Sequence, residues 1–412
     1  MPAVRPCERR PVPGEEWNTA PFPLAQVRGK NKPAAGRTLH GTGQLSILTE
    51  GNPSPSGLFD RCADMNVFDY EKLCDFQNLY LAYKASRRSK RNKREVIEFE
   101  METGTRIAEL SEELRNGTYR LSGYYHFTVH DPKVREIYAL HYRDRIVQHC
   151  LCDRLLAPYF ETHLIYDNAA CRKNKGTHFA LNRLEDFLHA HYREYGTEGY
   201  ILKCDIRKFF DSIPHEILKQ RLLTLVHDKR TGALLEHIVD SYAAAPGRGI
   251  PMGNQTSQWF ALYYLDPLDR LIKEQLRIKH YTRYMDDMVL VHKNKEYLQD
   301  CLQKMRILAE ELGLAFNAKT QIFPIKNGVE YLGWRLYLTE EGAVVRKLKK
   351  QSCRRMKRRL RKLKRDTEAG LVAPVKAEEA LTAYGAHLAH GNAHRLYASA
   401  VRTFRLARGS LA

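Results

Sequence analysis

Three aspartates in two strand-like stretches carry the strongest chemical signal in the sequence. Asp286 and Asp287 stand between the β-favouring run Tyr281–Tyr284 and the apolar run Met288–Val291, and this pattern predicts a hairpin with both acids at its tip. Asp205 ends another mostly apolar run of strand length. Neighbouring carboxylates repel each other unless cations bind them, and Mg²⁺ is the usual cation. A lone Asp-Asp pair could be a solvated turn, but a third acid from a second strand favours a metal site.

Two metal ions about 3.5–4 Å apart could activate a 3′-hydroxyl and stabilise a leaving pyrophosphate. Asp205, with Phe210 five positions on, and the run Tyr284–Asp287 resemble the A and C motifs of reverse transcriptases. Their order and separation suit a palm subdomain. The resemblance implies catalytic aspartates at Asp205, Asp286 and Asp287, and metal ligands at these three residues and Ile206. It also implies two Mg²⁺ ions, with Mn²⁺ as an alternative.

Phe210 is the candidate for sugar selection. In the family that the motifs resemble, an aromatic ring beneath the incoming sugar leaves no space for a 2′-hydroxyl, so it selects deoxynucleotides. Phe209 and Phe210 adjoin, and only one of them can face the site while the other packs in the core.

The stretch 249–258 resembles the B motif of the same family. Gly253 permits close approach of the backbone to a nucleotide, before a helix that is rich in apolar and aromatic residues. Met252 and Gln258 replace the more common Gln and Pro, and this form resembles the reverse transcriptases of diversity-generating retroelements. Met252, Gly253 and Gln258 are therefore substrate-binding candidates.

Two stretches before the palm, 133–148 and 167–177, resemble the finger motifs of bacterial reverse transcriptases. In the second, Arg172 and Lys173 lie close to a glycine, so they could neutralise a triphosphate, although an exposed basic turn is the plain alternative. Arg143 and Arg145, in the first, are weaker candidates that could equally pair with carboxylates.

Behind the palm acids, the stretch 317–323 resembles motif D and the stretch 331–334 resembles motif E. Lys319 could donate a proton to the leaving pyrophosphate, or it could be a plain surface lysine. Tyr331 and Gly333 are candidates for gripping the primer, as the resemblance to motif E implies.

A basic stretch follows the palm. Between Arg346 and Arg365, thirteen of twenty positions are Lys or Arg and none is acidic, while apolar residues recur at roughly helical spacing. Such a helix would repel itself without an anionic partner. We expect it to contact the template-primer duplex in a thumb. The nucleic-acid-binding candidates are Arg354, Arg355, Arg358 and Arg359.

Composition supports a nucleic-acid partner. The 412 residues include 67 Lys and Arg against 48 Asp and Glu, a net charge of +19, which favours a polyanion. No apolar stretch reaches the roughly 18 residues of a spanning helix, so we expect no membrane partner. The amino terminus lacks the apolar core of a signal peptide. Nine cysteines without a Cys-x-x-Cys pair indicate a reduced, cytoplasmic protein without structural zinc.

Together these patterns predict an α+β right-hand polymerase. The expected parts are a flexible Pro/Gly-rich basic extension (1–64), fingers (65–198), a palm (199–335) and a basic helical thumb (336–412). No ribonuclease H or integrase module is expected. The resemblance implies an RNA-directed DNA polymerase that extends a primer on template RNA with dNTPs.

The subfamily resemblance further implies an error-prone enzyme of a diversity-generating retroelement that copies its own RNA, with a small basic accessory protein as partner. A related bacterial reverse transcriptase, for example one in antiphage defence, is the alternative within the class. A non-catalytic RNA-binding chaperone is the alternative from another class, although a pure binder has no need of clustered carboxylates in a basic field.

Overall fold

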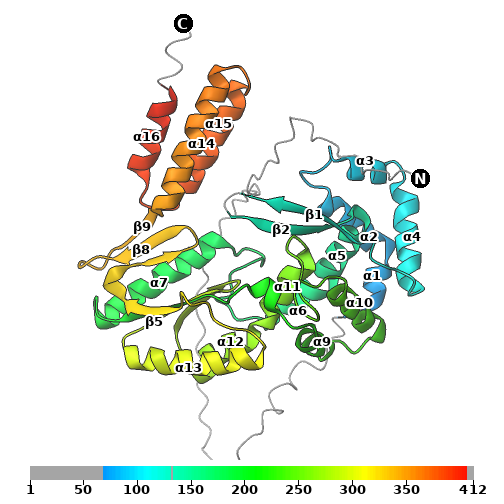
Figure 1. The fold of residues 1–412 in the computed structure, drawn as a ribbon, viewed down its shortest axis with the longest axis horizontal. Helices are drawn as coiled ribbons and strands as arrows, with labels where there is room; N and C mark the ends of the chain where they lie inside the picture. The colour runs from blue at the N-terminus through cyan, green and yellow to red at the C-terminus, as the bar shows by residue number, and fades with distance from the viewer. Residues whose placement is uncertain (1–67, 131–132, 406–412) are drawn as a thin grey trace, which may run out of the picture. The chain divides into compact units, whose positions relative to one another are not determined.

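The structure is a computed structural model, and it describes residues 68–130 and 133–405. The predicted extension 1–64 lies outside the described residues. In the described part, helices and antiparallel sheets both contribute to the core, so the fold class is α+β as predicted (Figure 1). No helix of the described residues is both long and apolar enough to cross a bilayer.

A four-stranded antiparallel sheet lies at the centre of the predicted palm. Its strand order is β4-β5-β3-β6. The strands are β3 (Tyr200–Cys204), β4 (His280–Tyr284), β5 (Asp287–His292) and β6 (Gln321–Pro324). The strand predicted to precede Asp205 and the hairpin predicted around Asp286 are both confirmed.

Both faces of this sheet are buried. Side chains alternate along a strand, and in β5 Val289 and Val291 join one apolar cluster while Met288 and Leu290 join another. The first cluster includes helix α7 (Thr177–Tyr195), and the second includes helix α13 (Lys295–Glu311). A strand that is covered on both sides needs a continuous apolar run, which the sequence of β5 supplies.

Further palm helices follow β3 and lead up to β4. They are α8 (Phe209–Ser212), α9 (His215–Leu223), α10 (Lys229–Asp240), α11 (Gln255–Tyr264) and α12 (Asp266–Arg270). Helix α11 is buried almost throughout and contains the apolar run that the sequence predicted as a helix. A π-helical turn, Leu271–Gln275, continues α12.

The predicted fingers combine helices with one hairpin. The helices are α1 (Tyr70–Cys74), α2 (Phe76–Ser86), α3 (Arg94–Glu100), α4 (Thr103–Arg115), α5 (Tyr142–Leu151) and α6 (Ala157–His163), and the π-helical turn Cys152–Leu156 joins the last two. The hairpin pairs β1 (Tyr124–Val129) with β2 (Arg135–Leu140). Apolar and aromatic residues recur at helical spacing from Phe68 to Ala85, and this pattern predicts one helix. The structure divides it, because Asp75 is extended (φ −67°, ψ 127°) and accepts a hydrogen bond from the Asn78 amide to begin α2.

A second sheet and three helices complete the described chain. The sheet has the order β7-β8-β9, with β7 (Val329–Tyr331), β8 (Trp334–Leu338) and β9 (Val344–Leu348). The helices are α14 (Lys350–Glu368), α15 (Pro374–Leu388) and α16 (His394–Arg405), and they pack around a small cluster that includes Met356 and Leu360 (Figure 1). The basic stretch therefore starts as a strand, because Arg346 to Leu348 pair with β8, and turns helical at Lys350. The buried Arg346 side chain also pairs with Glu185 in α7.

Candidate active site

The β4–β5 hairpin holds two of the predicted aspartates at its turn. Tyr284 pairs with Asp287, so Met285 and Asp286 form a two-residue loop. Met285 has φ 55°, a left-handed conformation that costs a residue with a side chain about 1–3 kcal/mol and persists only where surrounding contacts enforce it. Such strain is typical of functional turns. The turn presents Asp286 in the loop and Asp287 as the first residue of β5.

Asp205 reaches the same place from the neighbouring strand. Strands β3 and β5 are antiparallel, and Cys204 pairs with Met288, so the residue that follows β3 lies beside the one that begins β5. The carboxyl groups of Asp205 and Asp286 are within hydrogen-bonding reach of each other. The structure thus brings together the three aspartates that the sequence singled out.

The electrostatics of this group are unfavourable in the absence of cations. Burial raises the pKa of Asp286 well above its ordinary value, and contact with Asp205 raises it further. Burial also raises the pKa of Asp287 to about 6, although the ammonium of Lys203 opposes that change. A bound cation would relieve both effects.

Lys203 is a neighbour of the acids that the sequence analysis did not identify. Its Nζ lies 3.3 Å from Oδ1 of Asp287 and donates to the backbone carbonyl of Glu330. Residues 203 and 205 are two apart in an extended stretch, and this spacing places side chains on one face. That periodicity was the signal that could have linked Lys203 to the catalytic face.

Asn317 is a second residue that contacts the aspartates, and it binds Asp205. Its side-chain Nδ2 donates to Oδ2 of Asp205 at 3.1 Å, and its backbone N–H donates to the Asp205 carbonyl at 2.7 Å. The backbone N–H of Lys319 donates to Oδ1 of Asn317, while the Lys319 side chain is exposed. The segment that resembles motif D therefore contacts Asp205 through Asn317, and Lys319 lies two residues beyond.

The residues fit a divalent cation shared with a ligand. Oδ1 of Asp287 is buried and accepts no hydrogen bond from the described residues; the Lys203 ammonium is 3.3 Å away from it but donates to Oδ2 at 3.4 Å. Ile206 is buried, so only its backbone carbonyl could serve as a ligand. Among the described residues, no three acidic, His or Cys side chains form a closed metal cage. Mg²⁺ commonly binds one or two carboxylates together with substrate phosphates and water instead.

The two phenylalanines after Asp205 have different environments. Phe209 is buried in the core, whereas Phe210 is only half-buried. The carbonyl of Phe210 accepts a hydrogen bond from Ile250 at 2.9 Å, which fixes its position relative to the segment that resembles motif B. Of the pair, Phe210 is the one with surface available to a substrate, as the sugar-selection hypothesis requires.

The segment that resembles motif B packs beside a finger strand. Tyr138 in β2 donates its amide to the Met252 carbonyl at 3.3 Å. Gly253 is exposed with φ 113°, and a Cβ there would lie 3.1 Å from a methyl group of Ile137, so glycine permits the close approach. Met252 and Gln258 are half-buried. The segment thus joins the predicted palm to the β1–β2 hairpin.

Arg172 does not have the free guanidinium that the predicted triphosphate ligand needs. It is buried; its Nε donates to Glu161 at 3.0 Å, and its Nη atoms donate to backbone carbonyls of Glu161 and Ile165. Binding a phosphate would break these bonds, so the structure assigns Arg172 to holding the loop that follows α6. Lys173, next to it, has an exposed side chain and remains a candidate.

Tyr331 also differs from its predicted role. Its side chain is 1% exposed, and its ring packs in the cluster between α7 and the second sheet. It cannot contact a primer without leaving this core. Gly333, in the adjacent turn, is exposed with φ 87°, so the turn itself stays available to a ligand.

The other predicted cations divide between structural pairs and exposed positions. Arg143 pairs with Glu113 and Arg145 with Glu95, which is the alternative that the sequence left open. On α14, Arg354, Arg358 and Arg359 are exposed and Arg355 is half-buried.

The fold and the three grouped aspartates together define a class, the nucleotidyltransferases with a polymerase palm. The family described as reverse transcriptase (RNA-dependent DNA polymerase) matches residues 130–336, just over half of the chain. The chain belongs to the reverse transcriptase family. Members of this family copy template RNA and use divalent metal ions.

Among solved structures, two telomerases match parts of the chain at low sequence identity. Telomerase from Candida albicans, in complex with a TWJ fragment of telomeric RNA, is 14% identical over 71% of this chain and 55% of its own, with a TM-score of 0.43. Apo telomerase from Candida tropicalis, truncated from its C-terminal domain, is 12% identical over 56% of this chain and 58% of its own, with a TM-score of 0.41. This chain spans less than two thirds of either telomerase chain. No curated protein matches it.

Proposed function

We propose that this reverse transcriptase joins dNTPs to a primer at Asp205, Asp286 and Asp287, with two Mg²⁺ ions or, alternatively, Mn²⁺. The three carboxylates and the Ile206 carbonyl would hold the ions together with the nucleotide phosphates. When bound, the ions lower the pKa of the 3′-hydroxyl and stabilise charge on the leaving pyrophosphate. The observation that carries the proposal is the contact between the partly buried carboxyls of Asp205 and Asp286 beside Asp287, at an edge shared by two strands.

The chain's own residues prepare this site. Asn317 holds the carboxylate of Asp205 through a side-chain hydrogen bond, and Lys203 offsets part of the negative charge on Asp287. Phe210 stands where its ring would exclude a 2′-hydroxyl. Lys319, with an exposed ammonium, would donate a proton to the pyrophosphate, and Lys173 would approach the triphosphate from the predicted fingers.

The test of the chemistry replaces one acid without changing its size. Asp286→Asn should lower the rate of primer extension on RNA by about 10³-fold or more, because it removes a charge that metal binding requires. RNA binding should remain largely intact. Asp300→Asn is a matched control, since Asp300 is half-exposed on α13 and pairs only with Lys304 of the same helix. Near-parental extension by Asp286→Asn would contradict the two-metal assignment.

We further propose that the enzyme belongs to a diversity-generating retroelement and copies that element's RNA with frequent errors. Met252 and Gln258 support this subfamily, as do the sequences of the finger stretches 133–148 and 167–177. A small basic accessory protein would be its partner. A bacterial defence reverse transcriptase is the alternative, and a non-catalytic RNA chaperone would be the conclusion if primer extension failed altogether.

Fidelity provides the test of the subfamily. A glutamine amide can donate and accept hydrogen bonds near the templating nucleotide, whereas a thioether is only a weak acceptor. One hydrogen bond of about 1.4 kcal/mol corresponds to tenfold discrimination. We therefore expect frequent errors by the parent enzyme, chiefly opposite template adenine, and fewer by Met252→Gln.

The measurement is sequencing of cDNA copied from one defined RNA by both enzymes. Met252→Leu is the matched control, because it keeps an apolar side chain of similar volume and should keep the parental errors. Equal error spectra for all three enzymes would leave Met252 as a packing residue. A low parental error rate would also remove the retroelement assignment.

The predicted division into fingers (65–198), palm (199–335) and thumb (336–412) stands as part of this proposal. In it, Arg354, Arg355, Arg358 and Arg359 face the template-primer duplex, and Gly333 lets the turn before β8 approach the primer.

A further inference from the structure

A buried ion pair lies directly behind the catalytic turn. Arg283 in β4 and Asp269 in α12 are both fully buried and form an ion pair, and Nε of Arg283 donates to Oδ1 of Asp269 at 2.7 Å. Tyr281 donates its hydroxyl to the same Oδ1 at 2.6 Å. A buried pair of this kind contributes little net stability compared with apolar residues of equal volume, so its presence calls for another explanation.

The guanidinium of Arg283 also contacts the turn, through Nη1. Nη1 of Arg283 donates to the carbonyl of Met285 at 3.0 Å, and Nη2 donates to the Leu262 carbonyl in α11 at 3.1 Å. Met285 is the left-handed residue of the turn, and its carbonyl carbon is bonded to the amide nitrogen of Asp286. The Arg283 bond therefore fixes the orientation of the peptide that carries Asp286.

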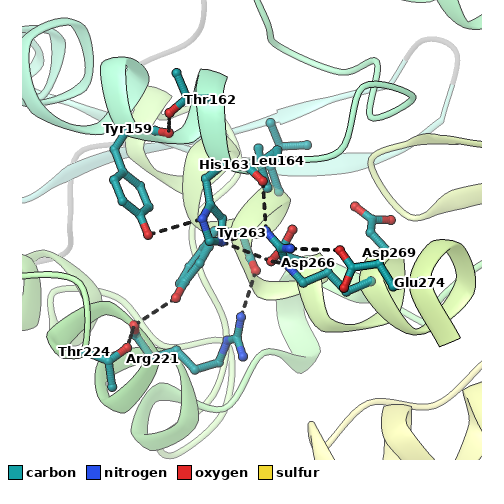
Figure 2. A network of polar contacts seen from close by, with 12 residues as sticks. Tyr159, Thr162, His163, Leu164, Arg221, Thr224, Tyr263, Asp266, Asp269 and Glu274 are labelled. Carbon is teal, nitrogen blue, oxygen red and sulfur yellow. Dashed lines mark hydrogen bonds and ion pairs between the residues drawn. The ribbon is translucent and has the colours of Figure 1, made fainter. Parts of the chain in front are cut away.

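The partner acid is itself anchored. Asp269 follows Asp266 by one helical turn, and Asp266 binds His163 of α6 at 3.2 Å and Arg270 at 2.8 Å (Figure 2). Arg270 also donates to the His163 carbonyl. Helix α12 is thus tied to α6 on one side and to the catalytic turn on the other.

We infer that Arg283 and Asp269 are positioning residues that hold the Met285–Asp286 peptide in its strained orientation and so place Asp286 for catalysis. The inference rests on the proposed role of Asp286. This role requires a planar group whose donors point in fixed directions, here Nε, Nη1 and Nη2 of Arg283. A guanidinium supplies such a group, and the ammonium of Lys does not. Misplacing a catalytic group by about 1 Å can cost about 10²-fold in rate.

The experiment compares two charge-conserving changes. Arg283→Lys should lower the single-turnover rate constant of folded enzyme by about 10²-fold, leave the Kd for template-primer RNA unchanged, and weaken Mn²⁺ binding as measured by electron paramagnetic resonance. Arg346→Lys is the matched control, because Arg346 is also buried and paired with a carboxylate but lies in β9. It should lower the melting temperature while it keeps the parental rate and Mn²⁺ affinity.

A second matched pair guards against loss of folding. Asp269→Asn should resemble Arg283→Lys, whereas Asp300→Asn, at an exposed acid of α13 that pairs with Lys304, should keep the parental rate. Tyr281→Phe removes only one hydrogen bond to Asp269 and should lower the rate several-fold in well-folded enzyme.

The inference is overturned if Arg283→Lys and Tyr281→Phe keep the parental rate and Mn²⁺ affinity while Asp286→Asn is inactive. That outcome leaves the proposed function intact. Activity of Asp286→Asn would instead contradict the proposed function itself.

Discussion

The catalytic edge of the palm sheet and the basic helix α14 both concentrate charge of one sign, but in different surroundings. At the palm edge, Asp205, Asp286 and Asp287 are partly buried, and burial raises the pKa of the last two. On α14 most of the Lys and Arg side chains are exposed, and only Met356 and Leu360 are buried. Charges in water interact weakly and are screened by salt, whereas charges withdrawn from water interact strongly and are screened little. The difference agrees with the roles proposed for the two regions, chemistry at the sheet edge and phosphate binding on α14.

The largest effect that tests this comparison is on the thumb. Replacing Arg354, Arg355, Arg358 and Arg359 with Gln should weaken duplex binding on all sequences by about 10²-fold at low salt. It should also reduce the slope of log K against log salt by about 3, since each lost phosphate contact reduces it by about 0.7–0.9. The rate constant at saturating template-primer should stay near the parental value. A salt titration of binding, combined with single-turnover extension, measures both quantities.

The control for this variant removes four cations elsewhere. Lys72, Arg94, Arg230 and Lys304 are exposed and pair with neighbouring carboxylates. Their replacement by Gln should change the slope little. An unchanged slope for the α14 variant would place this helix away from nucleic acid.

The next effect concerns sugar selection in the palm. Phe210→Ala should open space for a 2′-hydroxyl and reduce discrimination against ribonucleotides by about tenfold to a hundredfold, the usual range for steric selection in a pocket. Phe210→Tyr keeps the ring and should keep the discrimination. Competitive incorporation of dNTP and rNTP on one RNA template decides between them. Equal discrimination by all three enzymes would assign the selection to another residue.

The smallest effect is a pH dependence of stability. It arises from His178, where α7 meets the loop after α15. His178 stacks on His390, with His387 and Arg346 nearby. Burial and these neighbours lower the pKa of His178 from 6.5 to about 4. The unfolded chain therefore binds this proton more readily than the folded one. The contribution of neutral His178 to the free energy of unfolding is therefore complete above pH 6.5, and it is lost as the pH falls toward 4.

Thermal melting at pH 7.5 and pH 5 measures this contribution. Between pH 7.5 and pH 5, the melting temperature of His178→Gln should fall by about 1–2 °C less than that of the parent. The difference is small because other buried histidines, such as His191 and His280, also have a lowered pKa and are unchanged in the variant. Identical shifts would show that His178 is not protonated in this range.

The sequence predicted the elements that depend on local pattern. The β4–β5 hairpin, the strand before Asp205 and the helix around Trp259 follow from alternation, apolar runs and breakers, and all three are confirmed. The grouping of the aspartates was predictable because the motif order carries it. One predicted helix is divided at Asp75, because this residue caps the start of α2 instead of continuing α1.

Roles that depend on tertiary partners were not predictable in the same way. Arg172 resembles a phosphate ligand in sequence, yet it donates to the Glu161 carboxylate and to four backbone carbonyls. Tyr331 fills a core that forms only when α7 meets the second sheet. Asn317 and Asp269 belong to segments that are distant in sequence from the residues they contact, Asp205 and Arg283, so only the fold reveals these contacts. Lys203 and Arg283 are close in sequence to the aspartates, but their contacts still depend on tertiary partners.

The strand order β4-β5-β3-β6 has a consequence for how the molecule opens. Strands β3 and β5, next to which Asp205 and Asp286 lie, each have a hydrogen-bonded neighbour on both sides. In the described part of the chain, the cluster around which α14, α15 and α16 pack contains five buried residues. Amide protons are exchanged through local openings whose free energy rises with the buried contacts that must break. Backbone amides of β3 and β5 should therefore exchange with deuterium last, at the cost of global unfolding, while those of α14 to α16 exchange earlier. Helices α14 to α16, the proposed thumb, can thus loosen without disturbing the strands that position the three aspartates.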